Sequence, residues 1–221
     1  MQQLPILYSF VRCPYAIRAR LALVFAKQSV ILREVSLKSK PAEMLAISPK
    51  ATVPVMQLPD GSVLEQSRDI MQWALNQSDP YYLLSTSQQE CDDLLNENDT
   101  FFKTNLDRYK YPQRFNSEVD AYACILARTE AEKFLVQLDI RLQHSKFLVS
   151  NQISLADIGV MPFIRQFASV DQEWFNATPY HALQRWLSAW LQSPQFQITM
   201  QKFKPWQTGD AEVTVQFELK N

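Results

Sequence analysis

The stretch FVRCPYAIRAR, residues 10–20, decides how the N-terminal part of this chain folds. It follows Pro5–Tyr8, which reads as a short buried strand, and it opens a helix whose apolar residues recur at helical spacing: Ile17, Leu21, Val24 and Phe25. Pro14 suits the first helical position, because it has no N–H to donate and its φ is already set for a helix. Cys13 is therefore predicted at the N-cap.

This position predicts a reactive thiol. The unsatisfied amides of a helix N-terminus and the helix dipole favour an anion, and Arg12 and Arg18 add positive charge nearby. A fall in the thiol pKa from ~8.5 to ~6.5 would raise the thiolate fraction at neutral pH from a few per cent to roughly three quarters. The alternative is a small apolar residue that only fills the turn between strand and helix, and the basic neighbours favour the reactive thiol.

Composition argues against several classes of partner. The 221 residues include 22 Lys and Arg against 23 Asp and Glu, a net charge of −1. Such a chain has no basic field to hold a phosphate backbone, so no nucleic-acid partner is expected. No apolar run reaches the ~18 residues that span a bilayer, so no membrane partner is expected either.

The cysteines and the N-terminus predict a cytoplasmic protein. Cys13, Cys91 and Cys124 are odd in number and scattered, which suits a reducing compartment. The first residues lack the charged and apolar regions of a signal peptide. Only three glycines occur, which excludes Gly-rich phosphate loops. His144 and His181 fit no metal-ligand spacing, so no metal is expected.

The first 77 residues are predicted to fold in the order βαβ, helix, ββα. Val30–Val35 is a β-branched, apolar strand, which should run parallel to the first strand in a right-handed βαβ unit. A short helix follows over Pro41–Ile47. Asp60-Gly61 then joins two apolar segments, Val53–Leu58 and Ser62–Glu65, as an antiparallel hairpin. Ser67 is expected to cap the next helix.

That order, with Cys-Pro after the first strand and Val-Pro before the third, resembles the thioredoxin-like domain of the glutathione transferases. The resemblance implies the glutathione transferase fold, an α/β thioredoxin-like N-terminal domain followed by an all-α C-terminal helical domain. Its expected parts are a glutathione-binding domain over residues 1–77, a linker over 78–85, a helical domain over 86–202 and a C-terminal tail over 203–221.

The predicted helices of the second domain are Ser87–Tyr109, Ser117–Gln143, Leu155–Ala168, Tyr180–Leu191 and Pro194–Met200. Ser154 and Asp157 form a capping box, with Ile153 and Ile158 as a hydrophobic staple, and this resembles the buried N-capping box of the transferases. In the tail, apolar residues alternate with polar ones, a strand-like pattern without an evident partner: Val213, Val215, Phe217 and Leu219.

Cys13-Pro14-Tyr15-Ala16 is most similar to the cysteine-type members, namely the omega-like transferases and the two-domain glutaredoxins, and to bacterial-type chains among them. Ala16 stands where a dithiol glutaredoxin has its second cysteine. The resemblance therefore implies a monothiol site, whose intermediate an external thiol must resolve. Tyr8 or Ser9 could instead supply the hydroxyl that other transferases use to activate glutathione, but both precede the helix by several residues.

The resemblance also implies a set of glutathione-binding residues: Lys40, Val53, Pro54, Gln66 and Ser67. A cis Val53–Pro54 bond would turn the Val53 backbone toward an extended peptide. Ser67 would meet the γ-glutamyl end, where Gln66 replaces the common Glu, and Lys40 would meet the glycyl carboxylate. The alternatives are a trans-proline at a strand start, a plain helix cap and a solvated lysine.

The expected function is a glutathione-dependent thiol transferase in which Cys13 forms a mixed disulfide with glutathione. The alternatives are glutathione conjugation to electrophiles and a non-catalytic interaction module of the same fold. The partners implied are glutathione, a small electrophile or mixed disulfide, and a second copy in a homodimer. Residues expected at the second-substrate site are Tyr15, Phe101, Phe102, Asn105, Arg108 and Tyr109, although an aromatic stripe at helical spacing is also typical of a core.

Overall fold

The computed structural model describes residues 3–115 and 121–217. The chain divides into two compact units. The first consists of Met1–Tyr81 together with Gln192–Asn221, and the second of Tyr82–Leu191. Along the chain an α/β part is followed by a helical part, and this confirms the predicted fold class.

The first unit contains a five-stranded mixed sheet in the order β4-β3-β1-β2-β5. Strands β1 and β2, which precede and follow helix α1 in the chain, are parallel, as predicted for the βαβ unit. The other pairs are antiparallel, including the predicted hairpin of β3 and β4. The elements of this unit are β1 (Ile6–Ser9), α1 (Pro14–Phe25), β2 (Ser29–Glu34), α2 (Ala42–Ile47), β3 (Val55–Gln57), β4 (Val63–Leu64), α3 (Ser67–Gln77), α10 (Pro194–Thr199) and β5 (Val213–Gln216).

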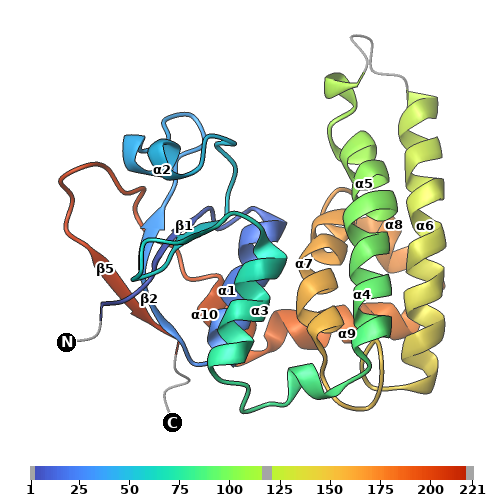
Figure 1. The fold of residues 1–221 in the computed structure, drawn as a ribbon. Coiled ribbons are helices and arrows are strands. Elements are labelled where there is room, and N and C mark those ends of the chain that lie inside the picture. The colour runs from blue at the N-terminus through green and yellow to red at the C-terminus, as the bar shows by residue number, and fades with distance from the viewer. Residues whose placement is uncertain (1–2, 116–120, 218–221) are drawn as a thin grey trace. The chain divides into compact units, whose positions relative to one another are not determined.

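Helices cover both faces of this sheet (Figure 1). On one face, Met44 of α2 packs with Tyr8, Val35 and Val55 in a buried cluster. On the other, α1 packs against α3, and almost every residue of α1 is buried. Because α1 is enclosed along its length, its N-terminus and Cys13 are held in a fixed position relative to the sheet.

The tail has a partner that the sequence pattern did not reveal. Strand β5 pairs antiparallel with β2, and Leu32 lies opposite Val213 in that register. Helix α10 packs beside α1 (Figure 1). The residues from Gln192 onward therefore belong to the first unit, whereas the expected boundary assigned residues up to 202 to the helical domain. Leu219, the last member of the predicted alternation, lies outside the described residues.

The second unit is helical in the residues that the structure describes. The predicted helix Ser87–Tyr109 forms as two helices joined by a π-helical turn, and the predicted start at Ser117 lies outside the described residues. Helix α8 was not predicted. Its N-cap is Asp171, which accepts a hydrogen bond from the Trp174 amide at 2.9 Å. The elements are η1 (Leu83–Ser85), α4 (Gln88–Glu97), the π-helical turn η2 (Asn98–Phe102), α5 (Lys103–Lys110), η3 (Pro112–Arg114), α6 (Ala121–His144), α7 (Leu155–Ala168), α8 (Gln172–Ala177) and α9 (His181–Gln192).

A buried carboxylate, Asp157, holds the second unit together. The predicted capping box is confirmed, since Asp157 accepts hydrogen bonds from the Ser154 amide at 3.0 Å and its hydroxyl at 2.6 Å. The same carboxylate accepts from the Leu148 amide at 3.0 Å and from the Trp186 indole at 3.1 Å. Burial raises the pKa of Asp157 to about 6, and the four donors act against that rise. One side chain thus connects α7, α9 and the loop before α7.

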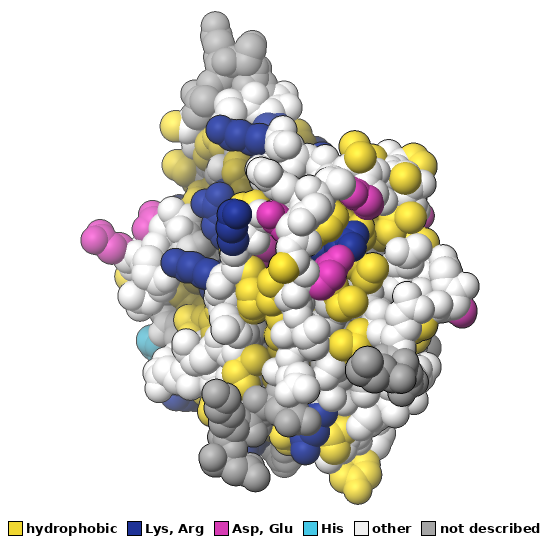
Figure 2. Space-filling view, turned by 90° about the vertical axis from the view of Figure 1, so that its left-hand side faces the viewer, with side chains coloured by type: hydrophobic (Ala, Val, Ile, Leu, Met, Phe, Trp, Pro, Cys, Tyr) yellow, Lys and Arg dark blue, Asp and Glu magenta, His cyan; other side chains and the backbone are white. Residues whose placement is uncertain are grey.

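The surface has a mixed charge pattern. Figure 2 shows basic and acidic side chains interspersed on one face, with apolar side chains exposed between them. Within residues 3–115 and 121–217, no helix combines the length and the apolar composition that crossing a membrane requires.

We expect Asp157→Ala to lower the free energy of unfolding by about 3 kcal/mol or more, because it leaves several buried donors without an acceptor, each at a cost of about 1–3 kcal/mol. Asp171→Ala is the matched control. It removes the same side chain from an exposed N-cap of the same unit and should cost about 1 kcal/mol. Urea titration of both variants measures the difference, and an equal loss in the two would contradict the connecting role of Asp157.

Candidate functional site

Cys13 occupies the N-cap of α1, as predicted, and Pro14 is the first helical residue. The Cys13 backbone is extended, and its carbonyl accepts the first helical hydrogen bond, from the Ile17 amide at 2.9 Å. A second bond, from the Cys13 amide to the Phe10 carbonyl at 2.9 Å, closes the turn that follows β1. The thiol is partly exposed and forms no disulfide with another described cysteine, so it lies at the positive end of the helix dipole within reach of a ligand.

The loop before β3 faces this thiol. The Val53–Pro54 peptide bond is cis, as predicted. The Cys13 thiol donates a hydrogen bond to the Val53 carbonyl, with 3.6 Å between sulfur and oxygen. A carbonyl acceptor favours the protonated thiol, whereas the helix amides favour the thiolate. The thiol is a weak hydrogen-bond donor, so this bond is a weak one.

Ser67 does not cap helix α3, so this prediction is wrong. The N-cap of α3 is Gln66, which is exposed, and Ser67 is the first residue of the helix. Its buried hydroxyl accepts a hydrogen bond from Arg18 Nε at 2.8 Å. Because the hydroxyl oxygen accepts from Arg18, its proton remains available to a further acceptor.

The sequence predicted the positive charge of Arg18 near Cys13 but not its contact with Ser67. It was expected to add positive charge near Cys13, and the structure shows it buried between α1 and α3, bound to Ser67 and lying 5.0 Å from the centre of the Tyr15 ring. No local signal could have found the Ser67 partner, which is 49 residues away in the sequence. Arg18 connects the helix of the thiol with the start of α3.

A buried carboxylate stabilises the turn between β1 and α1, residues 10–13, which we call the Cys13 turn. Glu34, at the end of β2, accepts a hydrogen bond from the Val11 amide at 2.8 Å. Its second oxygen lies 3.8 Å from a nitrogen of Arg20, an ion-pair distance that is too long for a hydrogen bond. Burial raises the pKa of Glu34 and lowers that of Arg20 to about 10. Sequence reasoning missed both residues, since a charged residue in a strand or helix gives no sign of burial.

The alternative hydroxyls are both enclosed. Tyr8 is 1 % exposed, and its hydroxyl is held by Arg33. Burial raises the Tyr8 pKa, which disfavours its phenolate. The Ser9 hydroxyl is fully buried and has no hydrogen-bond partner within the described part of the chain. Both hydroxyls are therefore closed off from solvent, in contrast to the partly exposed Cys13.

The predicted residues also include Lys40 of the first unit and a group from the second unit. Lys40 is partly exposed on the loop after β2, and no hydrogen bond or ion pair connects it to another described residue. Phe102 is completely buried and packs against Phe134 and Phe167, with ring centres 5.2 and 5.5 Å away. Phe102 is therefore a core residue of the helical unit, and its predicted contact with a substrate does not fit the structure.

A cavity of about 460 Å³ in the second unit contains two of the predicted substrate residues. Arg108 and Asn105 line it from α5, and Cys124 lines it from α6. Tyr109 packs instead on Phe167, 5.4 Å between ring centres, and burial raises its pKa. Arg108 and Tyr109 therefore belong to different faces of α5.

Two family comparisons cover most of the chain. The glutathione S-transferase N-terminal domain matches residues 7–81, and the glutathione S-transferase C-terminal domain matches residues 98–194. No match was found among the curated proteins.

Solved structures show the same fold at low sequence identity. A glutathione transferase family member from Pseudomonas fluorescens, with two glutathione molecules bound, is 18% identical with a TM-score of 0.77, covering 90% of this chain and 92% of that one. A glutathione transferase from Pseudomonas putida, with one glutathione disulfide bound per subunit, is 18% identical with a TM-score of 0.75, covering 90% and 91%. A glutathione S-transferase III in the apo form is 21% identical with a TM-score of 0.72, covering 88% and 94%.

The geometry of the Cys13 turn generates a prediction about reactivity. We expect the alkylation rate of Cys13 by iodoacetamide to reach half its maximum below pH ~8.5, the pKa of an ordinary cysteine, because the thiolate lies at a helix N-terminus. Peptide mapping separates Cys13 from Cys91 and Cys124. The control is the same chain unfolded in urea, where Cys13 loses the helix. A folded-state rate that reaches half its maximum at pH ~8.5 or above would contradict the prediction.

Proposed function

Since the chain belongs to the glutathione S-transferase family, we propose that it is a cysteine-type member, a glutathione-dependent thiol transferase with Cys13 as the nucleophile. The observation that carries the proposal is the partly exposed thiol at the N-cap of α1, which is in no disulfide with another described cysteine and lies 3.6 Å from the Val53 carbonyl. The buried Tyr8 and Ser9 hydroxyls support it further, because they leave Cys13 as the reactive group of the turn.

In this proposal glutathione binds in an extended conformation across the Cys13 turn. Val53, next to Pro54, pairs with its backbone, and the glycyl carboxylate meets Lys40. The γ-glutamyl carboxylate meets the Ser67 hydroxyl, whose oxygen is already oriented by Arg18. Gln66, exposed beside Ser67, contacts the same end. The two Pseudomonas structures, which contain glutathione or its disulfide, support this choice of ligand.

The proposed reaction has two exchange steps. The Cys13 thiolate attacks the glutathionyl sulfur of a mixed disulfide, a sulfur–sulfur bond forms to Cys13, and the other thiol leaves as a thiolate that takes up a proton. The thiolate of a second glutathione then attacks the glutathionyl sulfur, which releases glutathione disulfide and restores the Cys13 thiolate. The chain has Ala16 and no second cysteine in this turn, so an external thiol must perform the second step.

In this proposal, binding of glutathione also shifts the protonation equilibrium of the Cys13 thiol toward the thiolate. In the free protein the Val53 carbonyl accepts from the thiol. In the proposed complex a backbone N–H of the bound peptide donates a hydrogen bond to the Val53 carbonyl instead. The thiol then loses an acceptor that favours its protonated form. The thiolate therefore forms most readily when the substrate is present.

Among the predicted second-substrate residues, we propose Arg108 of α5 as the contact in the second unit and Tyr15 as a separate contact in the first. Tyr109 packs on Phe167 at the other face of α5. Arg108, exposed at the end of α5, provides a positive charge beside the cavity that also contains Cys124. The substrate class is a small mixed disulfide of glutathione or a small electrophile.

We expect Cys13→Ser to abolish the reduction of a glutathione mixed disulfide, because a hydroxyl cannot form the disulfide intermediate. Glutathione binding should survive, and the rate with a chlorinated aromatic electrophile should stay level or rise, since a hydroxyl at a helix N-cap still orients a glutathione thiolate. Mass spectrometry after treatment with glutathione disulfide should show one glutathionyl group on Cys13 of the wild type.

Cys91→Ala, which removes the thiol of a buried α4 residue outside this cavity, is the matched control and should retain the disulfide reductase activity. A Cys13→Ser variant that keeps this activity would contradict the mechanism. Vigorous conjugation by the wild type that the variant loses would assign Cys13 to conjugation instead. A chain that neither binds a glutathione resin nor becomes glutathionylated would be an interaction module.

We also propose a two-fold homodimer, on the basis of family membership. In such a dimer the same surface patches face each other across the axis. Light scattering at micromolar concentration should give about twice the chain mass of 25.7 kDa. A species at the single-chain mass would refute the dimer without affecting the proposal for Cys13.

A further inference from the structure

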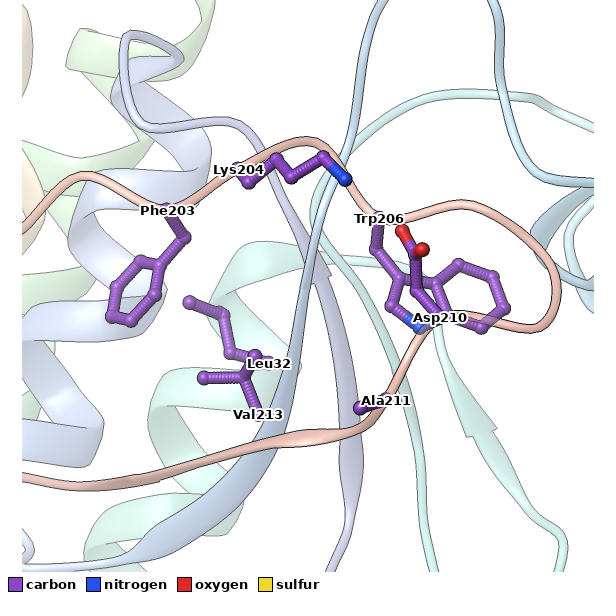
Figure 3. Close-up of a pocket in the computed structure, with 7 residues that line it drawn as sticks. All are labelled: Leu32, Phe203, Lys204, Trp206, Asp210, Ala211 and Val213. Atoms are coloured by element: carbon purple, nitrogen blue, oxygen red, sulfur yellow. The ribbon is translucent and has the colours of Figure 1, made fainter.

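The tail after residue 194, where the second family match ends, is part of the first unit. Strand β5 pairs with β2, and the segment that joins α10 to β5 passes beside the same strand (Figure 3). Figure 3 shows Trp206 and Asp210 of this segment beside a cavity of about 250 Å³ that Leu32 of β2 also lines. The tail is therefore a part of this unit that the two matched domains do not include.

Arg33 of β2 connects this tail with the interior of the unit. Its Nε donates to the Glu212 carboxylate at 3.3 Å, and a terminal nitrogen donates to the other oxygen of that carboxylate. The second terminal nitrogen donates to the Tyr8 hydroxyl at 2.5 Å. The guanidinium also lies 3.9 Å from the centre of the Trp206 ring. Because only 12 % of its side chain is exposed, Arg33 holds two tail residues and one core residue around one planar group.

The Tyr8 ring carries this connection to the loop before β3. Tyr8 belongs to the buried cluster that includes Met44 of α2 and Val55 of β3, and Val53 packs against the same cluster. Val53 is the residue whose carbonyl accepts from the Cys13 thiol. Side chains in a close-packed core cannot shift one at a time. The position of the Tyr8 ring therefore affects the position of Val53.

A second contact joins the tail to α2 from outside. The Thr208 hydroxyl donates to the Glu43 carboxylate at 3.0 Å, between residues 165 positions apart in the sequence. Glu43 lies in the first turn of α2, and the next residue, Met44, is completely buried in the Tyr8 cluster. Helix α2 is thus held on its buried side by the cluster and on its exposed side by the tail.

Helix α2 lies between two of the proposed glutathione contacts. Lys40 immediately precedes Pro41, the N-cap of α2, and Val53 follows the helix before β3. In the proposed complex Lys40 meets the glycyl carboxylate and Val53 pairs with the peptide backbone. A change in the placement of α2 would therefore alter both contacts at once.

We propose that Arg33 is a positioning residue for glutathione, through which the tail holds α2 and Val53 in the arrangement that binds the peptide. This inference rests on the proposed function. Arg33 touches no substrate and acts through Tyr8 and the buried cluster. Arg33 and Glu34 are adjacent in β2, so their side chains point to opposite faces of the sheet. Arg33 therefore affects the affinity for glutathione, whereas the Glu34 side chain supports the turn that carries the thiol.

The test compares the full-length wild type with Arg33→Gln. Calorimetric titration measures the Kd for glutathione, and steady-state kinetics use the mixed disulfide of glutathione with 2-mercaptoethanol. Loss of the contacts to Tyr8, Glu212 and Trp206 should raise both Kd and KM about fivefold or more, the effect of about one net hydrogen bond. The kcat and the pH profile of Cys13 alkylation should stay within about twofold of the wild type.

Tyr8→Phe separates positioning from catalysis by the tyrosine hydroxyl. The variant keeps the ring in the cluster and removes the acceptor of Arg33. It should raise KM and leave kcat unchanged, whereas loss of a catalytic hydroxyl would lower kcat. This variant also decides the question if Arg33→Gln does not fold.

Two matched controls separate positioning from stability. Arg141 donates to the Glu90 carboxylate at 3.0 Å and to the Leu148 carbonyl at 3.3 Å, all in the second unit. Arg141→Gln should therefore lower the Tm without changing the Kd for glutathione. Thr208→Val should raise the Kd about twofold. Thr214→Val makes the same change at an exposed threonine of β5, whose side chain forms no hydrogen bond within residues 3–115 and 121–217, and should leave the Kd unchanged.

Three results would overturn the proposal. They are equal glutathione affinity in the wild type and Arg33→Gln, a rise in Kd that Arg141→Gln reproduces at the same loss of Tm, and a kcat that falls in Tyr8→Phe while KM stays the same. In each of these the wild type still binds glutathione, so the proposed function is unaffected. A wild type that does not bind glutathione would refute the proposed function and this inference together.

Discussion

The buried pair of Arg20 and Glu34 is the interaction on which the first unit depends. Glu34 holds the Cys13 turn through the Val11 amide, and Arg20 holds the tail by donating to the Gln201 carbonyl at 2.9 Å. Burying two charges is expensive, and an apolar pair of the same volume would often be at least as stable. Removing one partner alone, however, leaves an uncompensated buried charge at a cost of roughly 3–5 kcal/mol. The pair therefore couples the turn, the sheet and the tail.

The position of the thiol follows from this support. A helix N-cap provides the electrostatics, but a thiol is useful only where its turn does not move. Pro14 sets the start of α1, Glu34 fixes the turn from the sheet side, and Arg18 joins α1 to Ser67 of α3. Three contacts from three elements thus define the surroundings of one sulfur. None of them is formed by Cys13 itself.

Short sequence motifs predicted those features of the structure that form within a few neighbouring residues. Cys-Pro after a strand located the N-cap, and the spacing of Ser154 and Asp157 located the capping box, because each motif acts within one helical turn. Contacts between distant residues were not predictable in this way. Periodicity marked Phe102 as apolar but could not distinguish a core position from a substrate contact, and it identified β5 as a strand without its partner β2.

The tail is attached to the first unit by backbone and side-chain contacts from several elements. The backbone of β5 satisfies the edge of β2, and the side chains of Val215 and Phe217 are buried, so both the hydrogen-bond register and packing set its position. At the other end, Arg20 holds the Gln201 carbonyl, and Trp206 is held by Glu34 between the two. Glu34 therefore serves two segments at once: its side chain accepts from Val11 in the turn before α1, and its carbonyl accepts from Trp206 in the tail. A shift of β2 at this one residue would loosen both, so the tail and the turn that carries Cys13 depend on the same point of the sheet.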